Sequence, residues 1–180
     1  MLIRDAGTGK NGGLDGNGRS SQDGLDADWS QIWPFWRKIV AARETYAWAP
    51  DTPEEKARAL WMGAGKRVHV VEDEDGVIVA TASVGPNYGV GGPAAHIANA
   101  GFMVDPDHAG RGVGRRLAEH VLEQAKADGY TGMVFNAVVE TNPAVRLWTS
   151  FGFTILGTVP DAYEHARHGR VGLHIMYRAL

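Results

Sequence analysis

The chain contains no cysteine among its 180 residues, which excludes disulfide bonds, zinc sites built on thiolates and a cysteine nucleophile. It has no apolar run near the roughly 18 residues that cross a membrane. Its first residues show no basic stretch followed by an apolar one, so we expect no secretory signal. The net charge of −3 gives no excess of positive charge that would attract nucleic acid. These absences fit a cytoplasmic protein that binds neither nucleic acid nor membrane.

The length and composition of the chain suit one compact domain. The residues are 44% hydrophobic, which is enough for a sizeable core, so we assign residues 1–180 to a single domain. Gly7–Gly24 differs from the rest because it is rich in glycine, asparagine, aspartate and serine. Such a segment cannot offset the entropy of ordering by burying apolar surface, and we predict a flexible insertion there.

Helical periodicity marks the segment from Asp28 to about Ala47. Asp28 and Gln31 are placed to form a capping pair, and Pro34 should kink or break the helix. Its tryptophan stripe, which includes Trp36, either packs in the core, the commoner role, or lines a binding pocket. A second helix is predicted to begin at a cap on Asp51 or Thr52 and to end near Met62.

Strands and helices alternate through the rest of the chain. Apolar runs predict seven strands, at Met1–Ala6, Arg67–Glu72, Val77–Val84, His96–Val104, Thr131–Val139, Phe153–Val159 and Val171–Arg178. Two more helices are predicted at Gly112–Asp128 and Pro143–Phe151, and loops at Gly85–Pro93 and Pro160–Arg170. The helix between the fourth and fifth strands makes a crossover, so those two strands should be parallel. The predicted fold class is therefore α/β or α+β, with a mixed sheet of six to seven strands and about four helices.

Three alternating glycines, Gly110, Gly112 and Gly114, lie between the fourth predicted strand and the helix after it. Glycine tolerates positive φ and the close approach of a ligand, and amides at a helix N-terminus bind anions. Arg111 and Arg115 add positive charge. A diphosphate is the natural ligand, and a flexible turn is the alternative. A dinucleotide fingerprint fits less well, because Arg115 stands where that motif requires glycine.

This loop resembles the phosphate-binding motif of the GNAT superfamily of N-acetyltransferases. The family motif reads Gln/Arg-x-x-Gly-x-Gly/Ala, and residues 109–114 read Ala-Gly-Arg-Gly-Val-Gly. The resemblance implies acetyl-CoA as co-substrate, with its diphosphate on main-chain amides that Ala109 leaves intact. The residues expected to bind the cofactor here are Ala109, Gly110, Arg111, Gly112, Val113, Gly114 and Arg115.

A second motif points to the same family. Asn142–Phe153 resembles Asn-x-x-Ala-x-x-Leu-Tyr-x-x-x-Gly-Phe, with one residue fewer between Asn142 and Ala144 and with Trp148 in place of the tyrosine. In the family that tyrosine often protonates the leaving thiolate. An indole N–H cannot serve as an ordinary acid, so Trp148 is expected to pack beside the cofactor with Asn142 and Ala144. Glu44–Glu55 is similar to the phosphinothricin and methionine sulfoximine acetyltransferases, and the overall resemblance covers roughly residues 25–180.

The resemblance also implies where the reaction takes place. In the family the cofactor lies between the splayed fourth and fifth strands, and its pantetheine pairs with the fourth like an added strand. Phe102, Met103 and Val104 are therefore expected to hold it. An amine attacks the thioester directly, through a tetrahedral intermediate whose oxyanion needs a main-chain donor near Met103 and Val104.

The general base is left open by the sequence. Asn99 stands where related enzymes carry glutamate, and an amide can orient a water but cannot accept the proton. His96, Glu140 and Tyr46 are the remaining side-chain candidates. His96 and Glu140 each have a commoner structural role, Tyr46 is better suited to shaping the acceptor pocket, and a chain of waters is another option. The residues expected around the acceptor are Tyr46, Trp36, Asn136 and Tyr163.

Three functions remain open at this stage. The first is acetylation of a small primary amine, such as an amino acid or an analogue. The second is acetylation of protein N-termini or lysines, which needs an open groove where Pro160–Arg170 suggests a closed one. The third is a CoA-binding sensor or partner-binding module without turnover. His165, His168 and His174 lack an acidic partner at ligand spacing, so we expect no metal. A homodimer is left open.

Overall fold

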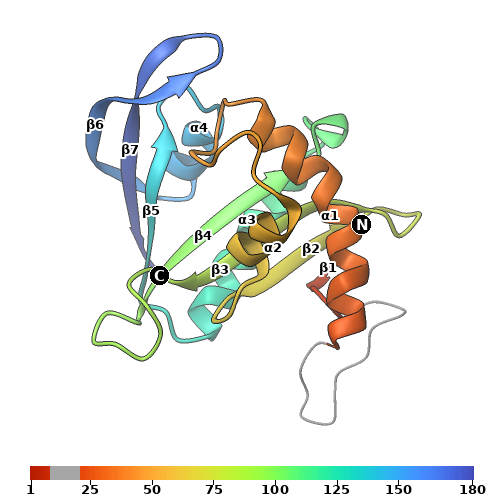
Figure 1. Cartoon of the computed structure of the whole chain (residues 1–180). Coiled ribbons are helices and arrows are strands. Elements are labelled where there is room, and N and C mark those ends of the chain that lie inside the picture. Colours follow the sequence, from red (N-terminus) through yellow and green to blue (C-terminus); the bar gives the residue numbers. More distant parts are fainter. Residues whose placement is uncertain (9–20) are drawn as a thin grey trace.

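The computed structural model describes residues 1–8 and 21–180 (Figure 1). These residues form a seven-stranded mixed sheet of order β1-β2-β3-β4-β5-β7-β6 and four α-helices. The strands are β1 (Leu2–Asp5), β2 (Arg67–Glu72), β3 (Ile78–Pro86), β4 (Ile97–Val104), β5 (Gly132–Val139), β6 (Thr154–His165) and β7 (Gly169–Ala179). The helices are α1 (Gln22–Ala41), α2 (Glu54–Met62), α3 (Val113–Ala127) and α4 (Ala144–Ser150), and a 3-10 turn covers Pro106–His108. The predicted fold class is confirmed.

Each face of the sheet is covered by its own apolar layer. Alternation along β2 supplies both layers, because Val71 packs with α3 and α4 while Val68 and Val70 pack with α1 and α2. The layer under α3 includes Leu117 and Val121, both fully buried. Figure 1 shows α1 and α2 on the near face of the sheet and α3 behind it. None of the described helices is both long enough and apolar enough to cross a membrane.

Helix α1 begins earlier than the sequence predicted. Ser21 caps it by accepting a hydrogen bond from the Gly24 amide at 3.1 Å, so the predicted pair of Asp28 and Gln31 is not a cap. Asp28 is instead buried in the helix, where it accepts from both terminal nitrogens of Arg4 at 2.6 and 2.8 Å. A buried carboxylate needs such a partner, and this ion pair attaches α1 to β1.

Three further features of the first half of the chain differ from the predictions. Pro34 lies inside α1 without ending it, so the predicted break is wrong. Helix α2 has Pro53 as its N-cap residue, with no side-chain cap from Asp51 or Thr52. The predicted insertion at Gly7–Gly24 falls largely on residues 9–20, outside the described part of the chain, but its last three residues already belong to α1.

The predicted loop at Pro160–Arg170 is wrong, because β6 and β7 form one long hairpin with its turn at residues 166–168. The pairing register shifts between Val159 and Tyr163, and Asp161 within that stretch has a φ of 53°. An irregularity of this kind accommodates Pro160, which has no amide to donate to the ladder. The strand therefore continues past a residue that normally ends one.

Candidate active site

The sheet is open between β4 and β5. These two parallel strands pair only at Ile97 with Gly132 and at Ala98 with Met133, and the register of β5 with its other neighbour shifts between Phe135 and Val138. Beyond Ala98 the two strands diverge, which confirms the expected splay. The second half of β4 is left without a neighbouring strand on that side.

The direction of the β4 backbone follows from its pairing with β3. The Asn87 amide donates to the Ile97 carbonyl at 2.8 Å, and the Asp105 amide donates to the Val79 carbonyl at 2.9 Å. Backbone groups alternate in direction along a strand, so the odd-numbered residues of β4 point theirs at β3. The even-numbered Phe102 and Val104 point theirs into the gap.

This parity corrects one expectation. Met103 pairs with Thr81 on β3, so its amide is turned away from the gap, and its side chain is buried in the layer under α1. Met103 is therefore not placed to donate to an oxyanion. The main-chain donors that face the gap are those of Phe102 and Val104.

A cavity of about 1150 Å³ fills the splay and extends toward the end of α1. Of the expected cofactor residues, it is lined by Phe102, Met103, Val104, Ala109, Asn142, Ala144 and Trp148. Of the expected catalytic and acceptor residues, it is lined by Asn99, Asn136 and Tyr46. The structure thus brings together residues separated by roughly a hundred positions in the chain.

Three asparagines meet across the splay. Asn99 of β4 donates to the side-chain carbonyl of Asn87 at 2.9 Å, and Asn136 of β5 donates to the same oxygen at 2.6 Å. Asn87 is a site residue that the sequence analysis missed, because it was assigned to a connecting loop. Strand β3 in fact reaches Pro86, which places Asn87 beside the start of the gap.

The glycine loop has the backbone that an anion cradle requires. Gly110 and Gly112 have φ of 77° and 74°, and a Cβ at either position would meet nothing within 4 Å. Helical hydrogen bonding in α3 begins with the Arg116 amide, which donates to the Gly112 carbonyl at 3.2 Å. The amides from Gly112 to Arg115 therefore have no helical acceptor.

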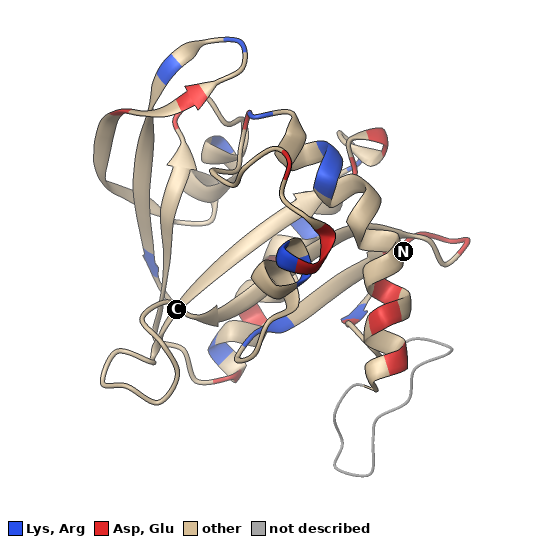
Figure 2. Ribbon diagram, in the orientation of Figure 1, with Lys and Arg blue, Asp and Glu red and all other residues tan. Residues whose placement is uncertain are grey.

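Cationic side chains surround this loop. Arg115 donates to the Ser150 hydroxyl at 3.2 Å and lies over the Phe151 ring at 5.1 Å, while Arg111 is exposed. Lys38 of α1 forms an ion pair with Asp107 beside the loop at 2.9 Å. Figure 2 shows Lys and Arg on the second half of α1 and on α4, whereas acidic residues gather on the first turns of α1.

Trp148 packs against the side of β4 and β5 that faces α4. It is 7% exposed, and its ring lies 4.8 Å from that of Phe102 and 4.9 Å from that of Phe135. The side-chain oxygen of Asn142 accepts from the amide of Ala144, the first residue of α4, at 2.9 Å. Both roles are structural supports for the cavity wall.

Tyr46 reaches the gap from the opposite face, out of the segment between α1 and α2. Its hydroxyl donates to the Phe102 carbonyl at 2.8 Å and accepts from the Phe102 amide at 2.9 Å. Burial raises the pKa of Tyr46 well above its usual range, so the hydroxyl is protonated and remains a donor.

Four of the residues expected as catalytic or acceptor-binding lie away from the cavity lining. His96 is exposed at the closed start of β4, and the exposed Glu140 places its carboxylate over Gly172 of β7. Trp36 is 1% exposed in the core, stacked on Trp48 at 5.2 Å. Tyr163 is buried in the hairpin and donates to the Tyr46 carbonyl at 3.1 Å. His96 and Glu140 are therefore poorly placed as bases.

Among the described residues that line the cavity, the ionisable side chains are Lys38, Glu44, Tyr46 and Lys66. Glu44 is paired with Arg167 at 2.7 Å. In the described part of the chain, no cluster of three His, Cys, Asp or Glu side chains is arranged to hold a metal ion.

The splayed sheet, the cavity and the cradle define an α/β domain with room for an extended anionic ligand between two parallel strands. A model of the acetyltransferase (GNAT) family matches residues 33–153. The GCN5-related N-acetyltransferase from Kribbella flavida is 45% identical in sequence and superposes with a TM-score of 0.84, over 99% of this chain and 97% of that one. The chain belongs to the acetyltransferase (GNAT) family, which confirms the expected fold and the class of acyl-CoA-dependent N-acetyltransferase.

Curated relatives agree with the expected subgroup. The L-methionine sulfoximine/L-methionine sulfone acetyltransferase of Salmonella typhimurium is 28% identical over 117 residues, which cover 63% of this chain and 68% of that enzyme. The N-acetyltransferase aca1 of Schizosaccharomyces pombe is 44% identical over 78 residues, 43% of this chain. That match spans only 36% of the length of aca1. The structure of yncA from Salmonella typhimurium, which contains its cofactor acetyl-CoA, is 25% identical with a TM-score of 0.74 and covers 100% of this chain and 94% of that one.

Proposed function

We propose that this protein transfers the acetyl group of acetyl-CoA to the primary amine of a small molecule, an amino acid or an analogue of one. The observation that carries the proposal is the unpaired second half of β4, which borders a cavity of about 1150 Å³ and leads to the glycine cradle. An extended pantetheine can pair with Phe102 and Val104 as an added strand. The cradle at the start of α3 is then positioned for the diphosphate.

The family relatives support acetyl-CoA as the co-substrate and an amino-acid-like acceptor. One structural neighbour contains acetyl-CoA, and one relative is named for acetylating methionine sulfoximine and methionine sulfone. In this chain the amine attacks the thioester carbon, and the Phe102 amide faces the position of the developing oxyanion. Main-chain donors of this kind do not depend on Ala109, the one departure in the phosphate motif.

The amide cluster offers a route for the amine proton. Asn99 and Asn136 both donate to Asn87, which leaves the side-chain oxygen of Asn99 free to hold a water between the strands. We propose that this water accepts the proton, because His96 and Glu140 lie away from the cavity. Such a water would pass the proton to solvent through the cavity mouth.

The contacts of the β6–β7 hairpin beside the cavity favour a small molecule over a protein substrate. The Ala166 amide donates to the Arg43 carbonyl at 3.1 Å, and Tyr163 donates to the Tyr46 carbonyl. These bonds connect the hairpin to the segment after α1, which borders the cavity through Glu44 and Tyr46, and so restrict the room for a peptide there. A CoA sensor without turnover remains the second candidate, because the described residues that line the cavity include no histidine and their one carboxylate, that of Glu44, is paired.

Two measurements test the function. Release of free thiol from acetyl-CoA, followed with a panel of amino acids and small amines, should show turnover, and a sensor would show none. Calorimetry should show that Gly112→Val weakens CoA binding by about a hundredfold, since a side chain there blocks the amides and one or two charge-assisted hydrogen bonds are worth about 3 kcal/mol.

A matched control separates the cradle from backbone strain. Gly76 has a φ of 80°, and a Cβ there would also meet nothing within 4 Å, but it lies in the turn between β2 and β3. Gly76→Val imposes similar strain on the backbone and should leave CoA affinity within about twofold. Equal losses in both variants, or no loss in a folded Gly112→Val protein, would refute the assignment of the cradle.

A further inference from the structure

The hydroxyl of Tyr46 binds the main-chain groups of Phe102 that face the gap beside the open half of β4. It accepts from the Phe102 amide at 2.9 Å and donates to the Phe102 carbonyl at 2.8 Å. An unpaired backbone amide is costly once buried, and the hydroxyl satisfies it without a second strand. Under the proposed function, the Phe102 amide beside this hydroxyl is the donor that the acyl oxygen of a thioester would take.

We propose that Tyr46 is a catalytic residue, and that its hydroxyl and the Phe102 amide together form a two-donor oxyanion hole. This proposal rests on the proposed function and deepens it. When the acyl oxygen takes the Phe102 amide, the Tyr46 hydroxyl loses its acceptor role there and turns its proton to that oxygen. The same hydroxyl that completes the empty strand thereby becomes the second donor.

The reaction step balances without any proton transfer by Tyr46. The lone pair of the amine nitrogen forms a bond to the acyl carbon, and the carbonyl π electrons move to the oxygen, where the two donors stabilise the charge. The C–S bond then breaks, its electron pair leaves with the CoA sulfur, and the carbonyl re-forms. The ammonium proton leaves to water. Because burial raises the pKa of Tyr46, its hydroxyl keeps its own proton throughout.

The tyrosine ring is fixed by aromatic packing. It stacks on Trp48 at 4.8 Å and meets the edge of Trp61 at 6.1 Å. Trp48 stacks in turn on the buried Trp36. A donor held in this way costs little reorganisation at the moment of reaction, which is the condition for electrostatic stabilisation of a transition state.

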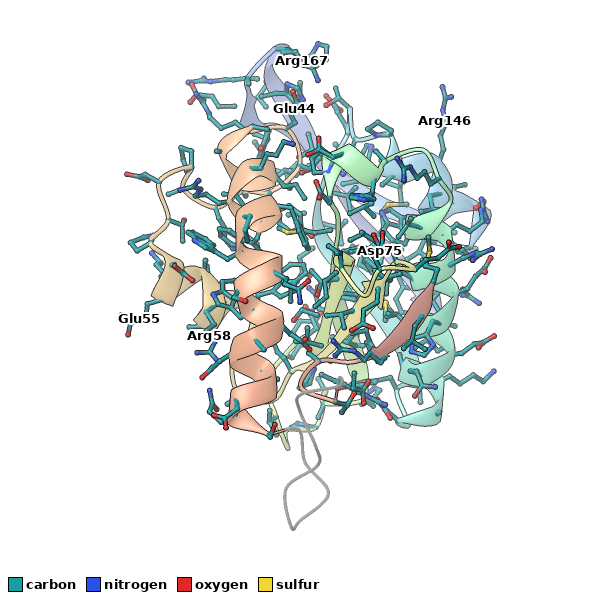
Figure 3. The ribbon with its side chains drawn as sticks, turned by 90° about the vertical axis from the view of Figure 1, so that its right-hand side faces the viewer. Glu44, Glu55, Arg58, Asp75, Arg146 and Arg167 are labelled. Carbon is teal, nitrogen blue, oxygen red and sulfur yellow. The ribbon has the colours of Figure 1, made fainter. Side chains whose placement is uncertain are left out.

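The β6–β7 hairpin holds the same segment from outside. Tyr163 donates to the Tyr46 carbonyl at 3.1 Å, the Ala166 amide donates to the Arg43 carbonyl at 3.1 Å, and Arg167 pairs with Glu44 at 2.7 Å. Figure 3 shows Arg167 and Glu44 close to each other, one from the hairpin and one from the segment after α1. Tyr163 is therefore a positioning residue that acts through Tyr46 from outside the cavity lining.

The decisive variant is Tyr46→Phe, which keeps the ring and removes the hydroxyl. We expect kcat to fall by about a hundredfold or more, the usual cost of removing one oxyanion donor, while the dissociation constant of CoA changes less than about threefold. An unchanged kcat, with or without tighter binding of acetyl-CoA, would overturn the proposal, because the hydroxyl would then only fill the gap. Wild-type turnover in the same assay would leave the proposed function standing in that case.

Two further variants test positioning and specificity of the effect. Tyr163→Phe should lower kcat by about tenfold with little change in the KM for acetyl-CoA, and should add almost nothing in the Tyr46→Phe background. Fully additive losses would overturn the role of Tyr163. Tyr130→Phe is the control, since Tyr130 is also partly buried but lies outside the cavity lining, and it should leave kcat within about twofold.

Discussion

The two ends of β4 are built in opposite ways. At its start the strand pairs with neighbours on both sides, through Ile97 with Gly132 and Ala98 with Met133 toward β5. At its end only β3 pairs with it, and the groups of Phe102 that face the gap are satisfied by the hydroxyl of Tyr46. Leaving a buried amide unpaired would cost about 1–3 kcal/mol. The site is therefore an incomplete part of the sheet, where one side chain, that of Tyr46, makes the hydrogen bonds that a neighbouring strand would otherwise make to Phe102.

Different groups stabilise the two ends. At the closed end the partner is backbone, so substitutions there should change stability alone. At the open end the partners are the side chains of Tyr46 and Trp148, which approach Phe102 from opposite faces. Substitutions there should change stability and chemistry together.

Trp148→Ala should have the largest effect on the open end. The indole is 7% exposed and packs on Phe102, Phe135 and Phe153, so its removal should lower the free energy of unfolding by about 3–5 kcal/mol. It should also raise the KM for acetyl-CoA, since the wall of the cavity loses its support. Denaturant unfolding and steady-state kinetics measure both. A loss below about 1 kcal/mol would show that the wall does not depend on this ring.

Gly132→Ala tests the closed end. A Cβ at Gly132 would lie 2.8 Å from Cε2 of Tyr177 and 3.2 Å from Cδ1 of Ile97, which is closer than packed carbons tolerate. The overpacking should cost about 1–3 kcal/mol of stability, visible as a lower midpoint in urea. Turnover per folded molecule should stay within about twofold, and a specific fall in kcat would contradict the division between the two ends.

Gly101→Ala is the matching change at the open end. A Cβ at Gly101 would lie 2.9 Å from Cζ3 of Trp61 and 3.3 Å from Oη of Tyr46, so the tyrosine hydroxyl must shift. Under the oxyanion proposal we expect kcat to fall about tenfold, equivalent to about 1.4 kcal/mol, in addition to a stability loss like that of Gly132→Ala. Steady-state assays at saturating acetyl-CoA measure this kcat. If the two alanine variants behave alike in kcat, the open end has no special role for Tyr46.

Much of the fold could be predicted from the sequence, and each wrong prediction has a physical cause. The positive φ predicted for the glycine loop is observed at Gly110 and Gly112, because this conformation is a local property of glycine. Helix α1 was placed too late because a glycine, Gly24, and its polar neighbours lie in the first turn after Ser21. Strand β6 was predicted to end at Val159 because Pro160 normally ends a strand. The strand tolerates this proline only because its register with β7 shifts there.

The site was less predictable than the fold, because its contacts join distant parts of the chain. Met103 was chosen as a donor, yet which residues of β4 face the gap depends on the register with β3, and the sequence does not state a register. Tyr46 bonds to a residue 56 positions away, with no periodic signal to announce it. Asn99 was named from the resemblance and Asn136 as an expected acceptor residue, and both line the cavity. Asn87 could be found only from the actual end of β3.

Trp148→Phe should have a small effect, and it separates packing from chemistry. The smaller ring keeps most contacts with Phe102 and Phe135 and removes the indole N–H. We expect kcat within about threefold of the wild type, because the donors to the oxyanion lie on Phe102 and Tyr46. A hundredfold fall in kcat with unchanged CoA affinity would mean that the indole N–H acts in the transition state.

The smallest expected effect is on stability at alkaline pH, and it tests the open end without any assay of activity. Burial raises the pKa of Tyr46 above its value in the unfolded chain, which is about 10. A group whose pKa is raised by folding contributes stability that is fully present below the unfolded pKa and is lost as the pH rises beyond it. The wild type should therefore lose thermal stability between about pH 9 and about pH 11 faster than Tyr46→Phe does.

Burial also raises the pKa of Tyr163 and Tyr130, so part of the loss persists in the variant and only the difference belongs to Tyr46. Tyr88→Phe is the control, because Tyr88 is 64% exposed, and its melting temperatures should follow those of the wild type. If the melting temperatures of Tyr46→Phe and the wild type fell equally with rising pH, the hydroxyl would not be enclosed at the gap in the sheet. The hydrogen bonds between Tyr46 and Phe102 could then not stabilise the open end of β4.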